Sequence, residues 1–186
     1  MNPGTFLKNC ERITTGCGFK KEIQGVDINS LRDADGTILT AATEPSREAL
    51  ETSFIGAVVS ASQTDLGTLT FKIPRDYDAS VDKLYIRFLA NSAGDTNTPT
   101  IDAAMYRKRD GAALSSDIDP TISAAVNNNT NKADWVEIVS EGDKWQPGDA
   151  VTVALTTSAH TTDALNIYAL EVVYFSDLVY YNNSER

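Results

Sequence analysis

The chain has 186 residues, of which 41% are hydrophobic and 23% charged, as in an ordinary soluble domain. Its formal net charge of −10 argues against nucleic-acid binding, which needs a cationic surface. No apolar run has the length of a membrane span and the first residues carry no apolar signal segment, so neither a membrane anchor nor signal-directed export is expected.

The first 53 residues have scattered apolar positions interrupted by glycines, and we expect 1–53 to be an extended or partly ordered arm. Within it, 26–29 predicts a short strand and 44–51 one or two helical turns. An arm of this kind gains its order on a neighbouring molecule in an assembly. Cys10 and Cys17 lie here; free or buried thiols are favoured, with a bridge or a shared metal left open.

Asp33, Asp35 and Gly36 resemble the start of a calcium-binding loop. The pattern lacks the further ligands and the closing glutamate that such a loop needs. Turn formation accounts for Asp and Gly in this order without a metal. We therefore predict no metal site and no cofactor.

The strongest strand signal is a pair of segments, 68–73 and 84–90, in which apolar and polar residues alternate. Pro74 ends the first segment because it has no backbone N–H. A period of two places one apolar row on one face of each strand. The residues expected to face the core are Leu69, Phe71, Ile73, Leu84, Ile86 and Phe88.

The rest of the chain repeats this pattern. Strands are predicted at 55–59, 100–107, 134–139, 150–155 and 164–175, with long loops at 115–120 and 127–131. The last strand is apolar on both faces and is expected in the centre of a sheet or in an interface. We assign Leu165, Ile167, Ala169, Val173 and Phe175 to one of its faces and Tyr168, Leu170, Val172 and Tyr174 to the other. The fold class predicted is all-β, an antiparallel jelly-roll-like β-sandwich over 54–178 with a C-terminal tail at 179–186.

Catalytic chemistry is not predicted. His160 could be combined with Asp163 and a serine into a triad, but no nucleophile-elbow motif is present. Carboxylate clusters could serve glycoside hydrolysis, yet Asp is expected in turns for backbone reasons. The clusters are Asp76, Asp78 and Asp82, and Asp117 and Asp119. A hydrolase remains the third hypothesis, and no catalytic residue is assigned.

Aromatic residues offer a carbohydrate-binding alternative. A sugar-stacking platform could be built from Trp135, Trp145, Tyr77 and Tyr85, with the loop at 127–131 beside it. Aromatic residues on strands also pack cores and layer edges, which is the competing interpretation.

Several turn and strand motifs together resemble a known family. They are Phe71-x-Ile73-Pro74-Arg75-x-Tyr77-Asp78, Asp82-x-Leu84, Gly94-Asp95-Thr96-x-Thr98-Pro99, Pro147-Gly148-Asp149, and His160-Thr161-Thr162-Asp163-Ala164-Leu165 before a tyrosine-rich final strand. Over about 68–180 the chain resembles the jelly-roll decoration (cement) proteins of tailed-phage heads. The resemblance implies a non-catalytic protein, made in the host cytoplasm, that stabilises the virion head by binding the major capsid protein on its outer surface, commonly as a homotrimer.

The first functional hypothesis is therefore capsid decoration, with contacts made by the arm and the last strand. The alternative is a receptor- or carbohydrate-binding β-sandwich of a virion or bacterial surface. The interface candidates are Tyr168, Leu170, Val172, Tyr174 and Trp145.

Overall fold

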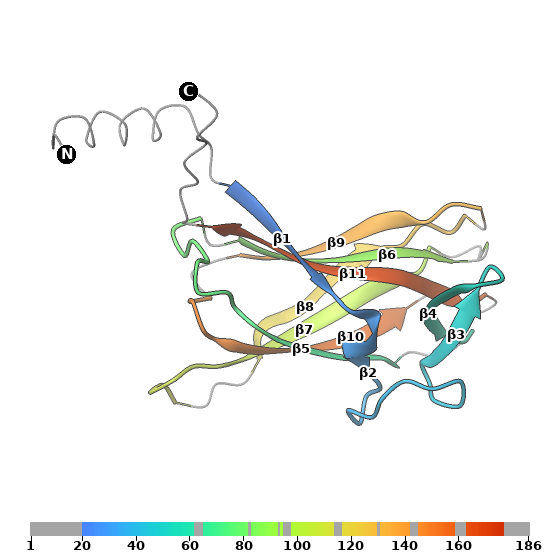
Figure 1. Cartoon of the computed structure of the whole chain (residues 1–186), viewed down its shortest axis with the longest axis horizontal. Helices are drawn as coiled ribbons and strands as arrows, with labels where there is room; N and C mark the ends of the chain where they lie inside the picture. The colour runs from blue at the N-terminus through green and yellow to red at the C-terminus, as the bar shows by residue number, and fades with distance from the viewer. Residues whose placement is uncertain are drawn as a thin grey trace, which may run out of the picture.

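Two antiparallel sheets face each other in this computed structural model (Figure 1). The structure describes residues 20–61, 65–81, 83–92, 94, 98–113, 117–129, 131–141, 145–158 and 163–176. The elements in this part of the chain are β1 (Lys20–Val26), the 3₁₀ turn η1 (Ile28–Ser30), β2 (Leu31–Arg32), β3 (Ser46–Leu50), β4 (Phe54–Val59), β5 (Asp65–Lys72), β6 (Lys83–Ser92), β7 (Thr100–Lys108), β8 (Asp117–Ala125), β9 (Asp134–Glu141), β10 (Ala150–Ser158) and β11 (Leu165–Ser176).

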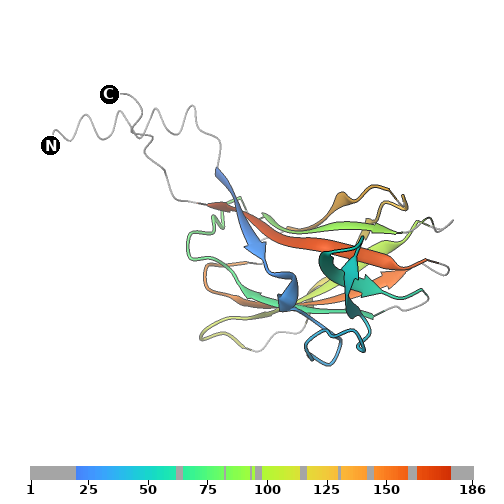
Figure 2. The ribbon, with the colours of Figure 1, turned by 45° about the vertical axis from the view of Figure 1, so that its right-hand side comes forward.

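Sheet A has six strands in the order β3-β4-β11-β6-β9, and β1 also pairs with β11. β6 pairs along one side of β11. On the other side β4 pairs with 165–167 and β1 with 170–176, so two strands share that side end to end (Figure 2). The prediction that the last strand is central is therefore confirmed, because β11 has neighbours on both sides.

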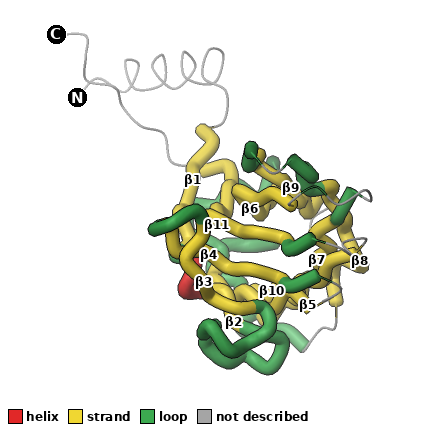
Figure 3. The backbone as a smooth tube through the Cα atoms, turned by 90° about the vertical axis from the view of Figure 1, so that its right-hand side faces the viewer, coloured by secondary structure: helices red, strands yellow, loops and turns green. Residues whose placement is uncertain are grey.

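Sheet B has five strands in the order β2-β5-β10-β7-β8. It packs against sheet A, and the core lies between the two layers (Figure 3). Alternation along each strand sends every second side chain into that core. Leu84, Ile86 and Phe88 of β6 are fully buried, as are Val151 and Val153 of β10. The predicted β-sandwich fold and the inward rows of these strands are confirmed.

The face assignment predicted for β11 is wrong beyond Ile167. Ile167 pairs with Ala90 and Ala169 pairs with Leu89, so Tyr168 is an extra residue in a β-bulge. A bulge shifts the alternation of inward and outward side chains by one residue. The odd-numbered residues therefore point inward before the bulge, and the even-numbered residues point inward after it. Leu165 and Ile167 face the core before the bulge, and Leu170, Val172 and Tyr174 face it afterwards.

Three local predictions are also corrected. Residues 46–50 form a strand, β3, where helical turns were predicted. Residues 117–125 form β8, where a loop was predicted at 115–120. β1, β2 and β3 pair with β11, β5 and β4, so the described part of the predicted arm 1–53 belongs to the sandwich. β2 and β3 have only two and five residues, too few to show a clear periodicity before their partners are known. Residues 1–19 and the predicted tail at 179–186 lie outside the described residues.

Candidate functional site

The outer face of sheet A, the face turned away from the core, carries a row of charged side chains across three strands. Arg87 of β6 pairs in register with Glu137 of β9 on one side and with Glu171 of β11 on the other. Arg87 Nη1 donates to Glu171 Oε2 over 2.9 Å, and Arg87 Nε lies 3.5 Å from Glu137 Oε2. The Arg87 and Glu171 side chains are 22% and 21% exposed, so the pair is partly shielded from water. Directly opposed cross-strand partners of opposite charge stabilise a sheet locally.

Trp135 lies beside this row, two residues before Glu137 on the same face of β9. Its indole is 38% exposed, although large aromatic side chains are usually well covered. The guanidinium carbon of Arg87 lies 4.7 Å from the centre of the Trp135 ring, which is a cation–π contact. The contact holds the ring in position while leaving part of it open to a ligand.

A second aromatic group occupies the same face on β11 and β4, two strands away from Trp135. Tyr168 packs against Phe54, with ring centres 5.7 Å apart at an angle of 53°. The Tyr168 hydroxyl lies 3.2 Å from Glu51 Oε1 and 3.2 Å from Asn91 Oδ1. Asn166 Nδ2 also donates to Asn91 Oδ1, over 3.2 Å. Burial, followed by the nearby Glu51 carboxylate, raises the pKa of Tyr168 above its usual value.

The two groups are joined by one continuous surface. In chain order β6 presents Arg87, Leu89 and Asn91 on this face, and Leu89 pairs with Trp135 on β9 and with Ala169 on β11. Neighbouring strands are about 4.8 Å apart. The face from β9 to β4 therefore spans roughly three strand spacings, or about 14 Å, with aromatic residues at both ends and Leu89, Arg87 and Glu171 between them. We call this surface the aromatic–polar face.

Of the interface candidates predicted from the sequence, one lies on the outer face of sheet A and four are buried. Tyr168 lies on the aromatic–polar face. Leu170, Val172 and Tyr174 belong to the core, because the bulge turned them inward. Trp145 is 1% exposed and donates from Nε1 to Ser140 Oγ over 2.8 Å. These four side chains therefore offer no outer surface in the isolated chain.

The predicted sugar-stacking residues also lie partly on the outer face and partly in the core. Trp135 and Tyr85 are on the outer face of sheet A, and Tyr85 packs 6.3 Å from Phe175. Tyr77, like Trp145, is buried in the core. The asparagine loop borders the face, because Asn91 Nδ2 donates to the Asn129 carbonyl over 3.0 Å.

The acidic clusters have structural roles where they are described. Asp76 accepts from Ser176 Oγ over 2.7 Å and lies 3.3 Å from the Tyr174 hydroxyl, so it ties its loop to the end of β11. Asp78 accepts from the Ser80 backbone N–H over 2.9 Å. Asp33 accepts from the backbone N–H groups of Asp35 and Thr37, the turn chemistry expected of it.

Some sequence candidates fall outside the described residues: Cys10, Cys17, Asp82, His160, and the side chains of Asp117 and Asp119. In the part that is described, no three His, Cys, Asp or Glu side chains gather as a metal site would require. The described helical residues include no segment with the length and hydropathy to cross a membrane.

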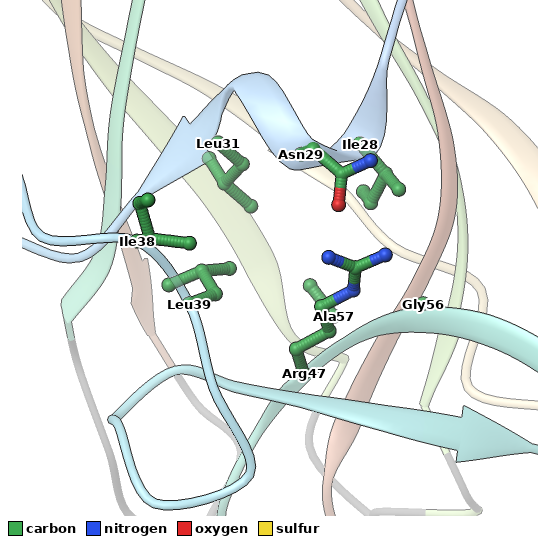
Figure 4. Close-up of a pocket in the computed structure, with 8 residues that line it drawn as sticks. All are labelled: Ile28, Asn29, Leu31, Ile38, Leu39, Arg47, Gly56 and Ala57. Atoms are coloured by element: carbon green, nitrogen blue, oxygen red, sulfur yellow. The ribbon is translucent and has the colours of Figure 1, made fainter.

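A small pocket lies where η1 and β2 approach β3 and β4, at the edge of the sandwich (Figure 4). Its volume is about 10 Å³, which is room for roughly one water molecule. Arg47 reaches from β3 toward Asn29 in this pocket. This pocket is therefore too small to hold a sugar ring.

Sequence reasoning missed Arg87, Glu137, Glu171, Asn91 and Asn166 as site residues. All but Asn91, which precedes Ser92, occupy a polar position between apolar ones, a pattern that indicates only an outward direction. They come into contact only through the pairing register of β6 with β9 and β11. This pairing brings together residues more than 30 positions apart in the chain.

No protein-family profile matches the sequence, and no curated protein matches it. Among solved structures, a xylan-binding module (CBM15) is similar with a TM-score of 0.54 and 14% identity, over 86% of this chain and 100% of that chain. A family 35 carbohydrate binding module from Clostridium thermocellum has a TM-score of 0.45 and 12% identity, over 80% of this chain and 97% of that chain. At such low identity, the first similarity shows the fold alone: this chain is an antiparallel β-sandwich of the jelly-roll type.

Proposed function

We propose that this protein is a non-catalytic carbohydrate-binding domain whose ligand lies on the aromatic–polar face. The observation that carries the proposal is the exposed indole of Trp135, held by Arg87 beside the carboxylates of Glu137 and Glu171. The C–H face of a sugar ring packs well on an aromatic surface. Its hydroxyl groups need acceptors and donors arranged around that surface, which carboxylates and carboxamides supply.

Three further features support this proposal. The second aromatic group, Tyr168 with Phe54, could support another sugar ring at the far end of the face. Asn166 lies beside it and brings a partly exposed carboxamide group to the face, whereas Asn91, to which Asn166 donates, is buried. The similarity in fold to a xylan-binding module indicates which ligands to test first, although a fold alone does not determine function.

The test is isothermal titration with a panel of neutral polysaccharides, among them xylan, β-glucan and galactan, comparing wild type with Trp135→Ala. Removing the indole should weaken binding at least tenfold, equivalent to about 1.4 kcal/mol. Tyr106→Ala is the matched control, because Tyr106 is also 38% exposed but lies on the outer face of sheet B. Equal weakening in both variants, or no binding to any member of the panel, would contradict the proposal. Trp145→Ala is unsuitable for this test because it removes a core side chain.

Capsid decoration remains a second candidate, supported by the motifs that resemble phage cement proteins and by the outer face of sheet B. That face carries small side chains in register, including Thr70 of β5, Thr152 and Ala154 of β10 and Ala104 of β7. The Thr70 and Thr152 hydroxyl oxygens lie 3.3 Å apart. A sheet face with small side chains fits a broad protein partner such as a major capsid protein, or further copies in a homotrimer.

This candidate is tested by mixing the full chain with expanded, undecorated phage heads and sedimenting them. Saturable binding that is lost in Ala154→Arg but kept in Trp135→Ala would support decoration through sheet B on the virion surface. No binding over a range of salt concentrations would contradict it.

A further inference from the structure

We propose that the aromatic–polar face selects its glycans by charge, accepting uncharged chains and rejecting chains with carboxylate or sulfate groups. This inference rests on the proposed carbohydrate-binding function and adds the ligand class. It is carried by the unequal charge of the row beside Trp135, where one guanidinium lies between two carboxylates.

The single cation of this row is already engaged by protein groups. Arg87 donates to Glu171 over 2.9 Å, faces Glu137 at 3.5 Å and lies over the Trp135 ring. Pairing an acidic sugar with Arg87 would require it to leave these partners. The row would otherwise meet the ligand with an excess of one negative charge, since two carboxylates outweigh one guanidinium.

Glu137 is the carboxylate most available to a ligand. Its side chain is 39% exposed, against 21% for Glu171, and its contact with Arg87 is the longer of the two. It follows Trp135 by two residues on the same face of β9, so a sugar stacked on the indole would lie next to it. A sugar hydroxyl can donate to this carboxylate, whereas an acidic substituent would be repelled by it.

Other charged groups on the aromatic–polar face also favour the rejection of acidic ligands. Glu51 lies 3.2 Å from the Tyr168 hydroxyl, which places a carboxylate at the second aromatic group. Lys132, near the start of β9, is paired with Asp134 over 2.8 Å. The described side chains at both ends of the face thus offer acceptors for hydroxyl donors, and Lys132 near the Trp135 end is already paired.

The experiment uses whichever neutral polysaccharide of the panel binds, in two derivatives of similar size. The hydroxyethyl derivative adds uncharged substituents and the carboxymethyl derivative adds carboxylates. The full chain should bind the carboxymethyl derivative at least tenfold more weakly at low salt, and this ratio should shrink as ionic strength rises. Glu137→Gln should reduce the ratio several-fold.

Asp35→Asn is the matched control, because it also removes one negative charge but lies in the turn after β2. It should leave the ratio unchanged if the discrimination is local. If Asp35→Asn reduces the ratio as much as Glu137→Gln does, the discrimination comes from the net charge of −10, and the inference is overturned. Equal binding of both derivatives by wild type would overturn charge selection while leaving carbohydrate binding intact. Failure of every neutral polysaccharide to bind would instead remove the proposed function, and the selection with it.

Discussion

Arg87 and Trp135 lie on neighbouring strands, and the guanidinium carbon of Arg87 is 4.7 Å from the centre of the Trp135 ring. They are diagonal neighbours, because Arg87 pairs directly with Glu137 and Trp135 with Leu89. One guanidinium thereby orients an exposed aromatic ring and lies between two carboxylates, one on each flanking strand. The relationship connects the stability of sheet A to the proposed ligand surface.

Replacing Arg87 by Met should therefore lower the free energy of unfolding by about 1–2 kcal/mol. The change removes the cation–π contact and leaves Glu137 and Glu171 without a cation between them. Urea unfolding measures the loss. Arg75→Met is the control, because Arg75 is exposed in a loop, and it should stay within about 0.5 kcal/mol of wild type. A loss no larger than that of the control would show that the row contributes nothing to stability.

Asp149→Asn should be more destabilising, by about 2–3 kcal/mol. Asp149 is 1% exposed and accepts two hydrogen bonds of 2.7 Å from Arg109, and it also accepts from the Gln146 N–H over 2.9 Å. Removing one partner of a buried pair leaves the other charge uncompensated, although the partial exposure of Arg109 moderates the cost. Asp110→Asn, at an exposed neighbouring position, should have little effect in the same urea titration. Similar midpoints for the two variants would contradict the structural role given to Asp149.

Gly67→Ala should be among the most destabilising single changes, with a cost of roughly 3 kcal/mol or more. Gly67 has φ of +120°, and a Cβ there would lie 1.9 Å from the Arg32 carbonyl oxygen, at the pairing of β2 with β5. Gly36→Ala is the matched control: its φ of +82° is also unfavourable for Ala, but a Cβ would meet nothing within 4 Å. The control should cost about 1 kcal/mol, the penalty of the left-handed backbone alone. Equal thermal unfolding midpoints for Gly67→Ala and Gly36→Ala would mean that β2 can move away from β5 without loss of stability.

Alkaline pH should destabilise the chain partly through Tyr168. Burial and Glu51 raise its pKa in the folded protein, so the unfolded chain releases the proton first as pH rises. The stabilisation is complete below the unfolded pKa of about 10 and is lost as pH rises through the folded value. Tyr168→Phe should flatten the fall of unfolding free energy above that pH, and Glu51→Gln should give an intermediate slope. An unchanged slope in Tyr168→Phe would contradict the prediction.

How much the sequence predicts differs between β6 and β11. The alternation of Leu84, Ile86 and Phe88 is sufficient to orient β6, because a strand without irregularities keeps a strict period of two. The same reasoning fails for β11, since the bulge at Tyr168 changes the inward parity. An apolar run on both faces carries no mark that would locate a bulge, so Leu170, Val172 and Tyr174 were assigned to an outer surface.

The sequence alone determined that this chain is an all-β sandwich and which residues of its regular strands face the core, because burial of apolar rows acts within each strand. Only the tertiary structure decided which side chains on the outer faces of the sheets contact each other. Trp135, Arg87 and Glu171 come from β9, β6 and β11, and their contact depends on backbone pairing between strands far apart in the chain. It also decided that Trp135 remains accessible while Trp145 is buried against Ser140. Either tryptophan could satisfy the local pattern, and only the packing of the two sheets distinguishes a core residue from a surface one.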